Sequence, residues 1–154
     1  MKPFDIFLSY AHDDENLMHR VRKQLVIYDR QDKIRKWWDR RITPGASLHK
    51  EIDHHIQHAD IILLFISPSF FDSDYCYDVE MEQALRQHAE QRSVVIPVIV
   101  RPCEWASSPL GNLLALPTDG RPLTKWPNRD EAAKNVADGV MRAVTELHKQ
   151  QATK

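Results

Sequence analysis

Apolar and polar positions fall into blocks along the chain that predict strands and helices in turn. Four short runs have the branched and aromatic residues typical of buried strands, at residues 4–10, 34–38, 59–67 and 93–100. The run at 59–67 is apolar almost throughout, as in a central parallel strand with helices on both faces. Pro97 is expected near the end of its strand or at a bulge, since an interior proline removes a ladder hydrogen bond. Residues 121–126 are expected to form a short edge strand.

Helical spacing of apolar residues fills the intervals between these runs. The final helix is marked by an apolar residue at every fourth position, Ala132, Val136, Val140 and Val144. The alternation of strand and helix predicts an α/β fold, a flavodoxin-like doubly wound sheet of about five parallel strands in the order 2-1-3-4-5, with helices on both faces. Three further helices are expected. The first carries Leu17, Val21, Leu25 and Tyr28, and the second carries Leu48, Ile52 and Ile56 after a cap at Ser47. The third carries Met81, Ala84 and Leu85, starts near Ser73 or Asp74 and ends near Arg92.

The length of 154 residues fits one domain. We expect residues 1–148 to form this domain and the polar residues 149–154 to be a flexible tail or linker.

Charge and composition narrow the function classes. The 21 Lys and Arg residues against 22 Asp and Glu give a formal charge of −1, so no net field favours nucleic acid or an anionic membrane. The longest apolar run, residues 61–66, is too short to cross a bilayer, and the amino terminus lacks the features of a signal peptide. Cys76 and Cys103 form no C-x-x-C motif, and a reducing cytoplasm fits this usage best.

Polar residues gather after the predicted strands, at residues 9–13, 39–47 and 67–80. In a doubly wound sheet, ligands bind outside the carboxyl ends of the strands, where the strand order reverses. The three stretches should therefore share one cleft. Glu80 can face this cleft from the third helix, whereas Glu82 is rotated by about 200° and should point elsewhere.

Several familiar chemistries lack their motifs. No Walker loop, dinucleotide fingerprint, H-E-x-x-H or G-x-S-x-G sequence is present. His54 and His58 lie at i, i+4, but a solvated helix face is favoured over a metal site, and no metal is expected. A phosphorelay receiver would need an aspartate at the end of the third strand, where Ser67 stands.

A single glutamate in a cleft can still break an N-glycosidic bond whose leaving group is already cationic, such as nicotinamide on ribose. That leaving group departs neutral, so the second carboxylate needed by ordinary glycosidases is not required. The carboxylate would bind the ribose hydroxyls and stabilise the oxocarbenium-like transition state. Composition and spacing permit this chemistry without demanding it, because an early-turn glutamate also serves the helix dipole.

Residues 4–10, 37–45 and 59–85, with the late Trp126, together resemble a TIR (Toll/interleukin-1 receptor) domain of the bacterial, NAD-cleaving type. The most discriminating piece is S-P-x-F-x-x-S-x-Y-C-x-x-x-E at 67–80, and the likeness covers nearly the whole chain. The resemblance implies an NAD+ glycohydrolase that releases nicotinamide and ADP-ribose or a cyclic isomer, with NAD+ as substrate and no required cofactor. The alternative that it leaves open is a non-enzymatic adaptor that self-associates.

The resemblance also implies roles for individual residues. Glu80 takes the position of the catalytic carboxylate. Residues 39–46 match the BB loop, which mediates assembly and gates substrate. The substrate-binding residues implied are Ser9, Tyr10 and His12 in the first loop, Ser73, Tyr75 and Cys76 beside the glutamate, Asp39 and Arg40 in the BB loop, and Trp38 and Phe71 as stacking surfaces.

Several of these residues can instead have a purely structural role. Cys76 is expected to be a packing residue, Asp39 can cap a turn, Ser9 can satisfy backbone groups at a strand end, and the aromatic residues can be core. Such domains often need assembly for activity, serve antiphage defence and carry a sensor module, fused or separate. The sequence leaves open whether the product is linear or cyclic and what triggers assembly.

Overall fold

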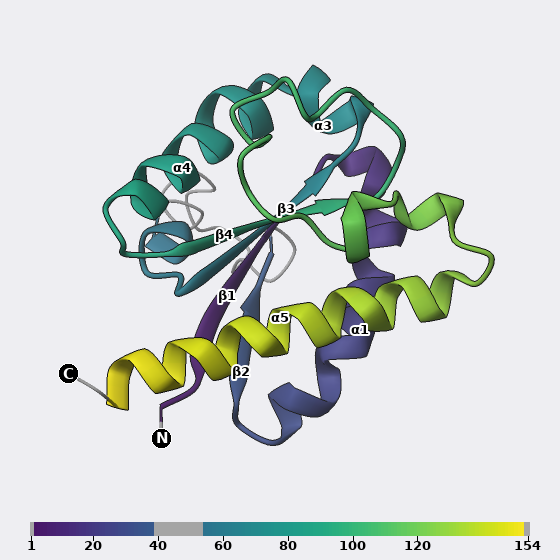
Figure 1. The fold of residues 1–154 in the computed structure, drawn as a ribbon. Helices are drawn as coiled ribbons and strands as arrows, with labels where there is room; N and C mark the ends of the chain where they lie inside the picture. Colours follow the sequence, from purple (N-terminus) through teal and green to yellow (C-terminus); the bar gives the residue numbers. More distant parts are fainter. Residues whose placement is uncertain (1, 39–53, 153–154) are drawn as a thin grey trace, which may run out of the picture.

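A computed structural model of the chain describes residues 2–38 and 54–152. Its sheet contains four parallel strands, β1 (Phe4–Ser9), β2 (Ile34–Trp37), β3 (Ile61–Ile66) and β4 (Val94–Ile99), in the order β2-β1-β3-β4 (Figure 1). In the register, Ser9 lies opposite Leu64, and Leu64 lies opposite Pro97. The doubly wound α/β fold is confirmed, and the strand order reverses between β1 and β3.

Helices cover both faces of this sheet. Helices α1 (Glu15–Arg30) and α5 (Arg129–Ala152) lie on one face, while α3 (Pro68–Asp72), the π-helix η3 (Tyr75–Met81) and α4 (Glu82–Ala89) lie on the other (Figure 1). Three short 3₁₀ turns complete the described elements: η1 (His12–Asp14), η4 (Thr118–Gly120) and η5 (Leu123–Lys125). Residues 54–57 are helical, and the rest of the helix predicted from Ser47 lies outside the described residues.

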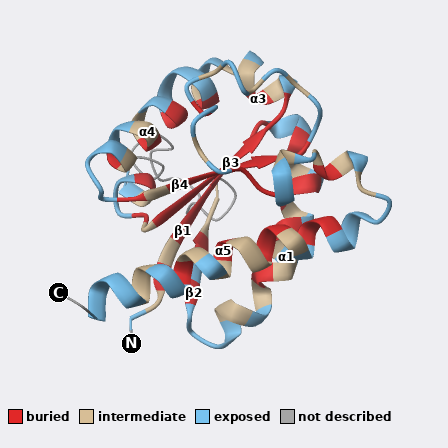
Figure 2. Cartoon of the chain, in the orientation of Figure 1, coloured by how far each residue is buried: buried red, intermediate tan, exposed pale blue. Residues whose placement is uncertain are grey.

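The core is built around β3, in which every residue is buried (Figure 2). Because successive side chains of a strand point to opposite faces, β3 feeds two apolar clusters. Ile61, Leu63 and Phe65 join the cluster under α1 and α5, and Ile62, Leu64 and Ile66 join the cluster under α3, η3 and α4. A strand that is apolar at every position is therefore explained by cover on both faces.

The two long helices bury the apolar positions that the sequence predicts, which confirms both helices. Leu17, Val21 and Leu25 of α1 are buried, and so are all four of the predicted α5 positions at 132, 136, 140 and 144. Helix α5 continues through residues 149–152, where the sequence predicts a flexible tail. Lysine, glutamine and alanine are good helix formers, so nothing in these residues stops the helix.

Pro97 lies inside β4 rather than at its end or at a bulge, so that expectation is wrong. β4 is the edge strand of the described sheet, and the carbonyl of Pro97 faces outward to accept from the Leu116 N–H at 2.9 Å. The nitrogen of Pro97 points to this same outer side. The missing N–H therefore costs the β3–β4 ladder nothing.

The fifth strand expected at residues 121–126 is also wrong, because this segment contains the 3₁₀ turn η5. Trp126 Nε1 donates to the carbonyl of Arg121 at 3.2 Å, and the Arg121 guanidinium lies over the Trp126 ring at 5.7 Å. These contacts close the segment on itself instead of extending it along β4. The outer neighbour of β4 is a single parallel bridge between Val98 and Leu116.

The third helix is divided in a way that the sequence does not predict. A short helix, α3, comes first, with Pro68 in its first turn and Ser67 as its cap, whose Oγ accepts from the Phe70 N–H at 3.0 Å. The helix expected from Ser73 or Asp74 then begins as the π-helix η3 and continues as α4, which ends at Ala89 instead of near Arg92.

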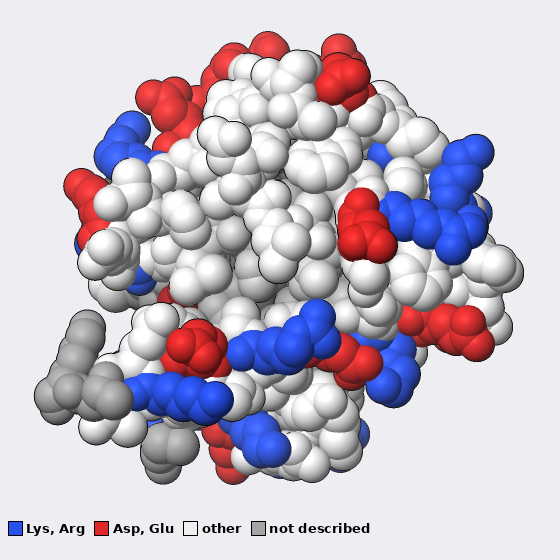
Figure 3. Space-filling model, in the orientation of Figure 1, with Lys and Arg blue, Asp and Glu red and all other residues white. Residues whose placement is uncertain are grey.

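Charged side chains of both signs lie near one another on the face drawn in Figure 3, notably along α5. This distribution agrees with the near-neutral formal charge of −1. None of the helices described is long and apolar enough to span a membrane.

Candidate active site

Glu80 lies where the carboxyl end of β1 meets the π-helix η3. Its side chain is only 3% exposed, and Ser9 Oγ donates to Glu80 Oε1 at 3.0 Å. Ser9 is the last residue of β1, and side-chain alternation turns it to the same face as Phe7, under η3. Glu82, two residues farther on, is exposed and pairs with Arg86 at 3.7 Å, so the predicted difference between these two glutamates is confirmed.

The residues beside Glu80 on η3 have clear local roles. Ser73 caps the start of this helix, since its Oγ accepts from the Cys76 N–H at 3.1 Å. Cys76 is buried in the apolar cluster, as expected for a packing residue. Tyr75 packs at the margin of the same cluster. The π-helical hydrogen-bond pattern is rare and is frequently found at functional sites.

A second buried carboxylate, Asp14, lies at the other end of the first loop. Asp14 is fully buried, and its carboxylate accepts from Ser67 Oγ and from Arg101 Nε, the latter at 2.7 Å. A buried carboxylate is tolerated when it is paired and hydrogen-bonded, and here both partners follow the carboxyl ends of other strands. This role of Asp14 was not predicted from the sequence, although Arg101, two residues past the end of β4, could have been recognised as a partner for a buried acid.

These contacts bring the first and third predicted polar stretches together. The pairs Ser9–Glu80, Asp14–Ser67 and Asp13–Ser69 each join residues 9–14 to residues 67–80, the last at 3.2 Å. These two stretches therefore lie side by side at one edge of the sheet, and their sharing of one ligand-binding cleft stays a prediction. The second stretch, residues 39–47 with Asp39, Arg40 and the predicted BB loop, lies outside the described residues.

The remaining predicted substrate contacts are spread around this edge. Tyr10 is buried in the cluster under α1 and α5, on the other face of the sheet from Glu80. Trp38 packs on α1, where the Arg22 guanidinium lies 5.3 Å from its ring centre. Phe71 is half-buried, with its ring 5.7 Å from that of Tyr77, and His12 is exposed near Glu15. Packing explains Tyr10 and Trp38 in this state, and their contact with substrate stays a prediction.

The thiol of Cys103 has little nucleophilic character. Burial raises the pKa of the Cys103 thiol, and the carboxylates of Glu104 and Asp14 raise it further. This thiol therefore stays protonated at neutral pH. The described residues contain no group of three or more histidine, cysteine or acidic side chains placed to hold a metal ion.

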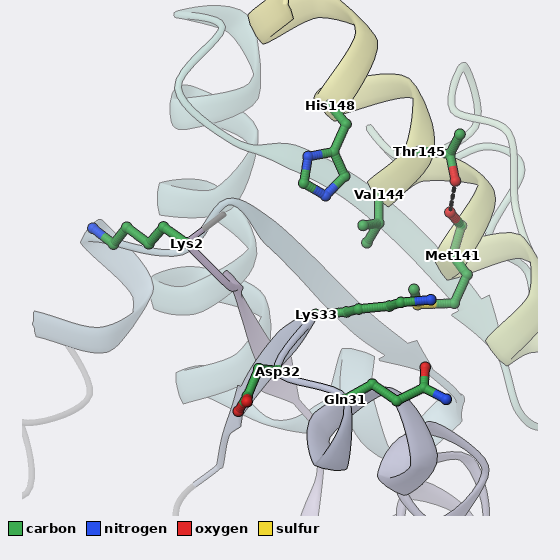
Figure 4. Close-up of a pocket in the computed structure, with 8 residues that line it drawn as sticks. All are labelled: Lys2, Gln31, Asp32, Lys33, Met141, Val144, Thr145 and His148. Atoms are coloured by element: carbon green, nitrogen blue, oxygen red, sulfur yellow. Dashed lines mark hydrogen bonds between the residues drawn. The ribbon is translucent and has the colours of Figure 1, made fainter.

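A pocket of about 460 Å³ lies at the opposite end of the sheet. Figure 4 shows its lining residues, which come from the amino terminus, the turn between α1 and β2, and the last turns of α5. Thr145 Oγ1 in this pocket is already bonded to the carbonyl of Met141 at 3.0 Å. The pocket lies away from the carboxyl ends of the strands, so we assign the candidate site to Glu80 and its neighbours. The residues that line this separate pocket are Lys2, Gln31, Asp32, Lys33, Met141, Val144, Thr145 and His148.

Comparisons with known proteins identify the family and agree with the fold. A family model described as TIR domain matches residues 6–135. The TIR domain of the Toll-related receptor TRR-2 from Hydra magnipapillata has a TM-score of 0.57 and 25% identity, covering 73% of this chain and 82% of that chain.

Two curated relatives extend the comparison. The uncharacterized protein y4lF of Sinorhizobium fredii (strain NBRC 101917 / NGR234) is 48% identical over 138 residues, covering 90% of this chain and 43% of that protein. The 2' cyclic ADP-D-ribose synthase BtTIR of Bacteroides thetaiotaomicron is 26% identical over 98 residues, covering 63% of this chain and 33% of that protein. The chain thus spans less than half the length of either relative.

Proposed function

Since the chain belongs to the TIR domain family, we propose that it cleaves the bond between nicotinamide and ribose in NAD+, with Glu80 as the catalytic carboxylate. The observation that carries this proposal is the bond from Ser9 Oγ to Glu80 Oε1 at the carboxyl end of β1, next to the point where the strand order reverses. The similarity to a bacterial 2' cyclic ADP-D-ribose synthase supports it.

The chemistry needs one carboxylate. Nicotinamide in NAD+ carries a positive charge and leaves as a neutral molecule, so no general acid has to protonate it. As the bond breaks, positive charge develops on the ribose, and a carboxylate held against it stabilises the transition state. The Ser9 hydroxyl holds the Glu80 carboxylate in one orientation.

The burial of Glu80 bears on how activity would be controlled. With 3% of its surface exposed, the carboxylate can contact a ribose only after neighbouring groups move aside. We therefore propose that self-association opens or completes the site through the BB loop at residues 39–46, and that the dilute monomer is nearly inactive. Specific activity that does not change with protein concentration would contradict this.

The direct test is nicotinamide release from NAD+ by concentrated protein, with a crowding agent to promote assembly. We expect Glu80→Gln to lower the rate by at least about 100-fold, the range seen when a transition-state electrostatic partner is removed. Glu82→Gln is the matched control, because Glu82 is exposed on the same helical segment, and its rate should equal that of the wild type. Equal rates for Glu80→Gln and Glu82→Gln would refute the role of Glu80.

The same burial also favours a second candidate, an adaptor that self-associates without catalysis, in which Glu80 only ties η3 to β1. The two candidates separate in one comparison. An enzyme loses nicotinamide release in Glu80→Gln while keeping self-association, whereas an adaptor releases no nicotinamide in any assembled state. We further propose a cytoplasmic role in bacterial antiphage defence, triggered by a sensor module on the same or another chain.

A further inference from the structure

We propose that Arg101 binds the pyrophosphate of the dinucleotide, and that Asp14 holds it in position to do so. This inference rests on the proposed function, since it assigns a second binding residue to the same site. Arg101 lies two residues past the end of β4, at the carboxyl edge of the sheet, and its backbone nitrogen lies 3.5 Å from the carbonyl oxygen of Ile66 in β3. It was not among the binding residues expected from the sequence.

The first argument is the geometry of the guanidinium. Arg101 Nε donates to Asp14 Oδ1 at 2.7 Å, while 44% of the Arg101 side chain is exposed. Arginine has five N–H donors, of which four are on the two Nη atoms. Among the described residues, no acceptor is bonded to those Nη atoms. One edge of the guanidinium is therefore fixed by a buried carboxylate, and the other is presented to solvent as a rigid pair of donors.

The second argument is charge. The described segments at this edge, residues 9–15, 67–80 and 100–104, contain one lysine or arginine, Arg101, against eight carboxylates. Such an edge suits the cationic nicotinamide ring but would repel the two negative charges of a pyrophosphate. A guanidinium binds phosphate oxygens through two parallel hydrogen bonds, and Arg101 is the described side chain that can do this here. The carboxylates are those of Asp13, Asp14, Glu15, Asp72, Asp74, Asp78, Glu80 and Glu104.

The third argument is position. The first loop starts at Ser9, which is bonded to Glu80, and reaches Asp14, which is bonded to Arg101. Five residues span at most about 18 Å when fully extended, so the two bonded pairs are close neighbours along one edge. In a dinucleotide, one ribose separates the nicotinamide bond from the pyrophosphate. A substrate placed with that bond at Glu80 can therefore extend along the first loop toward Arg101.

The test measures binding of ADP-ribose, which keeps the pyrophosphate and lacks the scissile bond, by calorimetry on concentrated protein with the crowding agent. We expect the Asp14→Asn/Arg101→Gln double variant to bind ADP-ribose at least about 10-fold more weakly than Asp14→Asn alone, since a charge-assisted bidentate contact is lost. Replacing both partners avoids leaving a buried carboxylate unpaired. The matched control is Arg92→Gln, because Arg92 is also half-exposed and pairs with a carboxylate, Glu90, at 2.8 Å, but lies at the amino edge.

A second variant keeps the proposal testable if the double variant does not fold. Arg101→Lys retains the charge beside Asp14 but loses the planar pair of donors, and it should weaken ADP-ribose binding by several-fold. Unchanged ADP-ribose affinity in the Arg101 variants, or no measurable binding of ADP-ribose by the wild type, would overturn the proposal.

The outcomes also separate this inference from the proposed function. If no nicotinamide is released from NAD+ but ADP-ribose binding depends on Arg101, the cleavage reaction fails and the pyrophosphate site stands. If nicotinamide release depends on Glu80 but ADP-ribose binds the Arg101 variants normally, the reaction stands and the pyrophosphate site fails.

Discussion

Charged groups differ in burial between the amino edge of the sheet, where the strands begin, and the carboxyl edge, where they end. At the amino edge, Asp5 pairs with Arg35 on the neighbouring strand at 2.8 Å, and about half of the arginine side chain stays in water. At the carboxyl edge, Asp14 and Glu80 are withdrawn almost completely from solvent and bonded to residues 53, 87 and 71 positions away. Burying carboxylates costs free energy, and the two almost fully buried carboxylates of the described residues both lie at the carboxyl edge. The edge that bears the cost is the one where a doubly wound sheet binds its ligand.

Removing the Asp14 side chain should give the largest effect on stability and is the most direct test of this difference between the two edges. We expect Asp14→Ala to lower the free energy of unfolding by about 2–4 kcal/mol, because Ser67 and Arg101 lose their common acceptor. The matched control is Asp13→Ala, since Asp13 is exposed and bonds only at the surface to Ser69. Urea unfolding of both variants gives the measurement, and equal stabilities would show that the buried cluster contributes nothing special.

Ser67 should give the next largest effect. Its Oγ donates to Asp14 and accepts from the Phe70 N–H, so it joins the cap of α3 to the buried carboxylate. We expect Ser67→Ala to cost about 1–2 kcal/mol, the upper range for loss of a helix cap. Ser69→Ala, on the same short helix, should change stability much less in the same urea experiment. A larger loss for Ser69→Ala would reverse our assignment of the cap.

The amino edge should respond more weakly. We expect Arg35→Gln to lower the free energy of unfolding by less than about 1 kcal/mol, because the Asp5–Arg35 pair is partly exposed and screened by water. The effect should shrink further when the salt concentration is raised. A loss as large as that of Asp14→Ala would erase the difference between the two edges.

Replacing Asp60 should have the smallest effect on the free energy of unfolding, and it should stabilise the fold instead of destabilising it. Burial raises the pKa of the Asp60 carboxyl, and the charge of Asp5 adds to this rise, although the Asp5 N–H, which donates at 2.8 Å, opposes it. The folded chain thus holds this proton more tightly than the unfolded chain. Its stabilising contribution is complete below the unfolded pKa and is lost as pH rises through the folded pKa.

We therefore expect Asp60→Asn, which keeps an acceptor for Asp5, to be slightly more stable than the wild type at neutral pH. Thermal unfolding at neutral pH and again in acid checks this, and the advantage should disappear in acid. An advantage that persists below the unfolded pKa would have to come from something other than the charge of Asp60.

Local pattern was enough for the parts of the fold that local forces decide. The apolar run of β3 and the four-residue repeat of α5 predicted both elements, because each reports burial of its own side chains. The carboxyl-edge position of Glu80 followed from the order of elements alone. Ser9 and Glu80 were then found in contact.

The parts that sequence reasoning missed depend on partners distant in the chain. Pro97 is acceptable because β4 is an edge strand, and no local signal says which strand is at the edge. Residues 121–126 have the composition of a strand, but Trp126 folds back on Arg121. No local pattern predicts the partners of Asp14, because only the meeting of β1, β3 and β4 brings its side chain to Ser67 and Arg101.

The π-helix from Tyr75 to Met81 makes the length of this segment as important as its composition. Removing one residue between Ser73 and Glu80 would let the backbone close in the ordinary α-helical pattern, because a π-helical turn holds about one residue more than an α-helical turn. When this chain is aligned with a relative, a one-residue gap between the serine and the glutamate therefore marks a change of helix type in this segment. Such a gap can leave the glutamate and the helix after it in place, so it is no evidence that the carboxylate has moved.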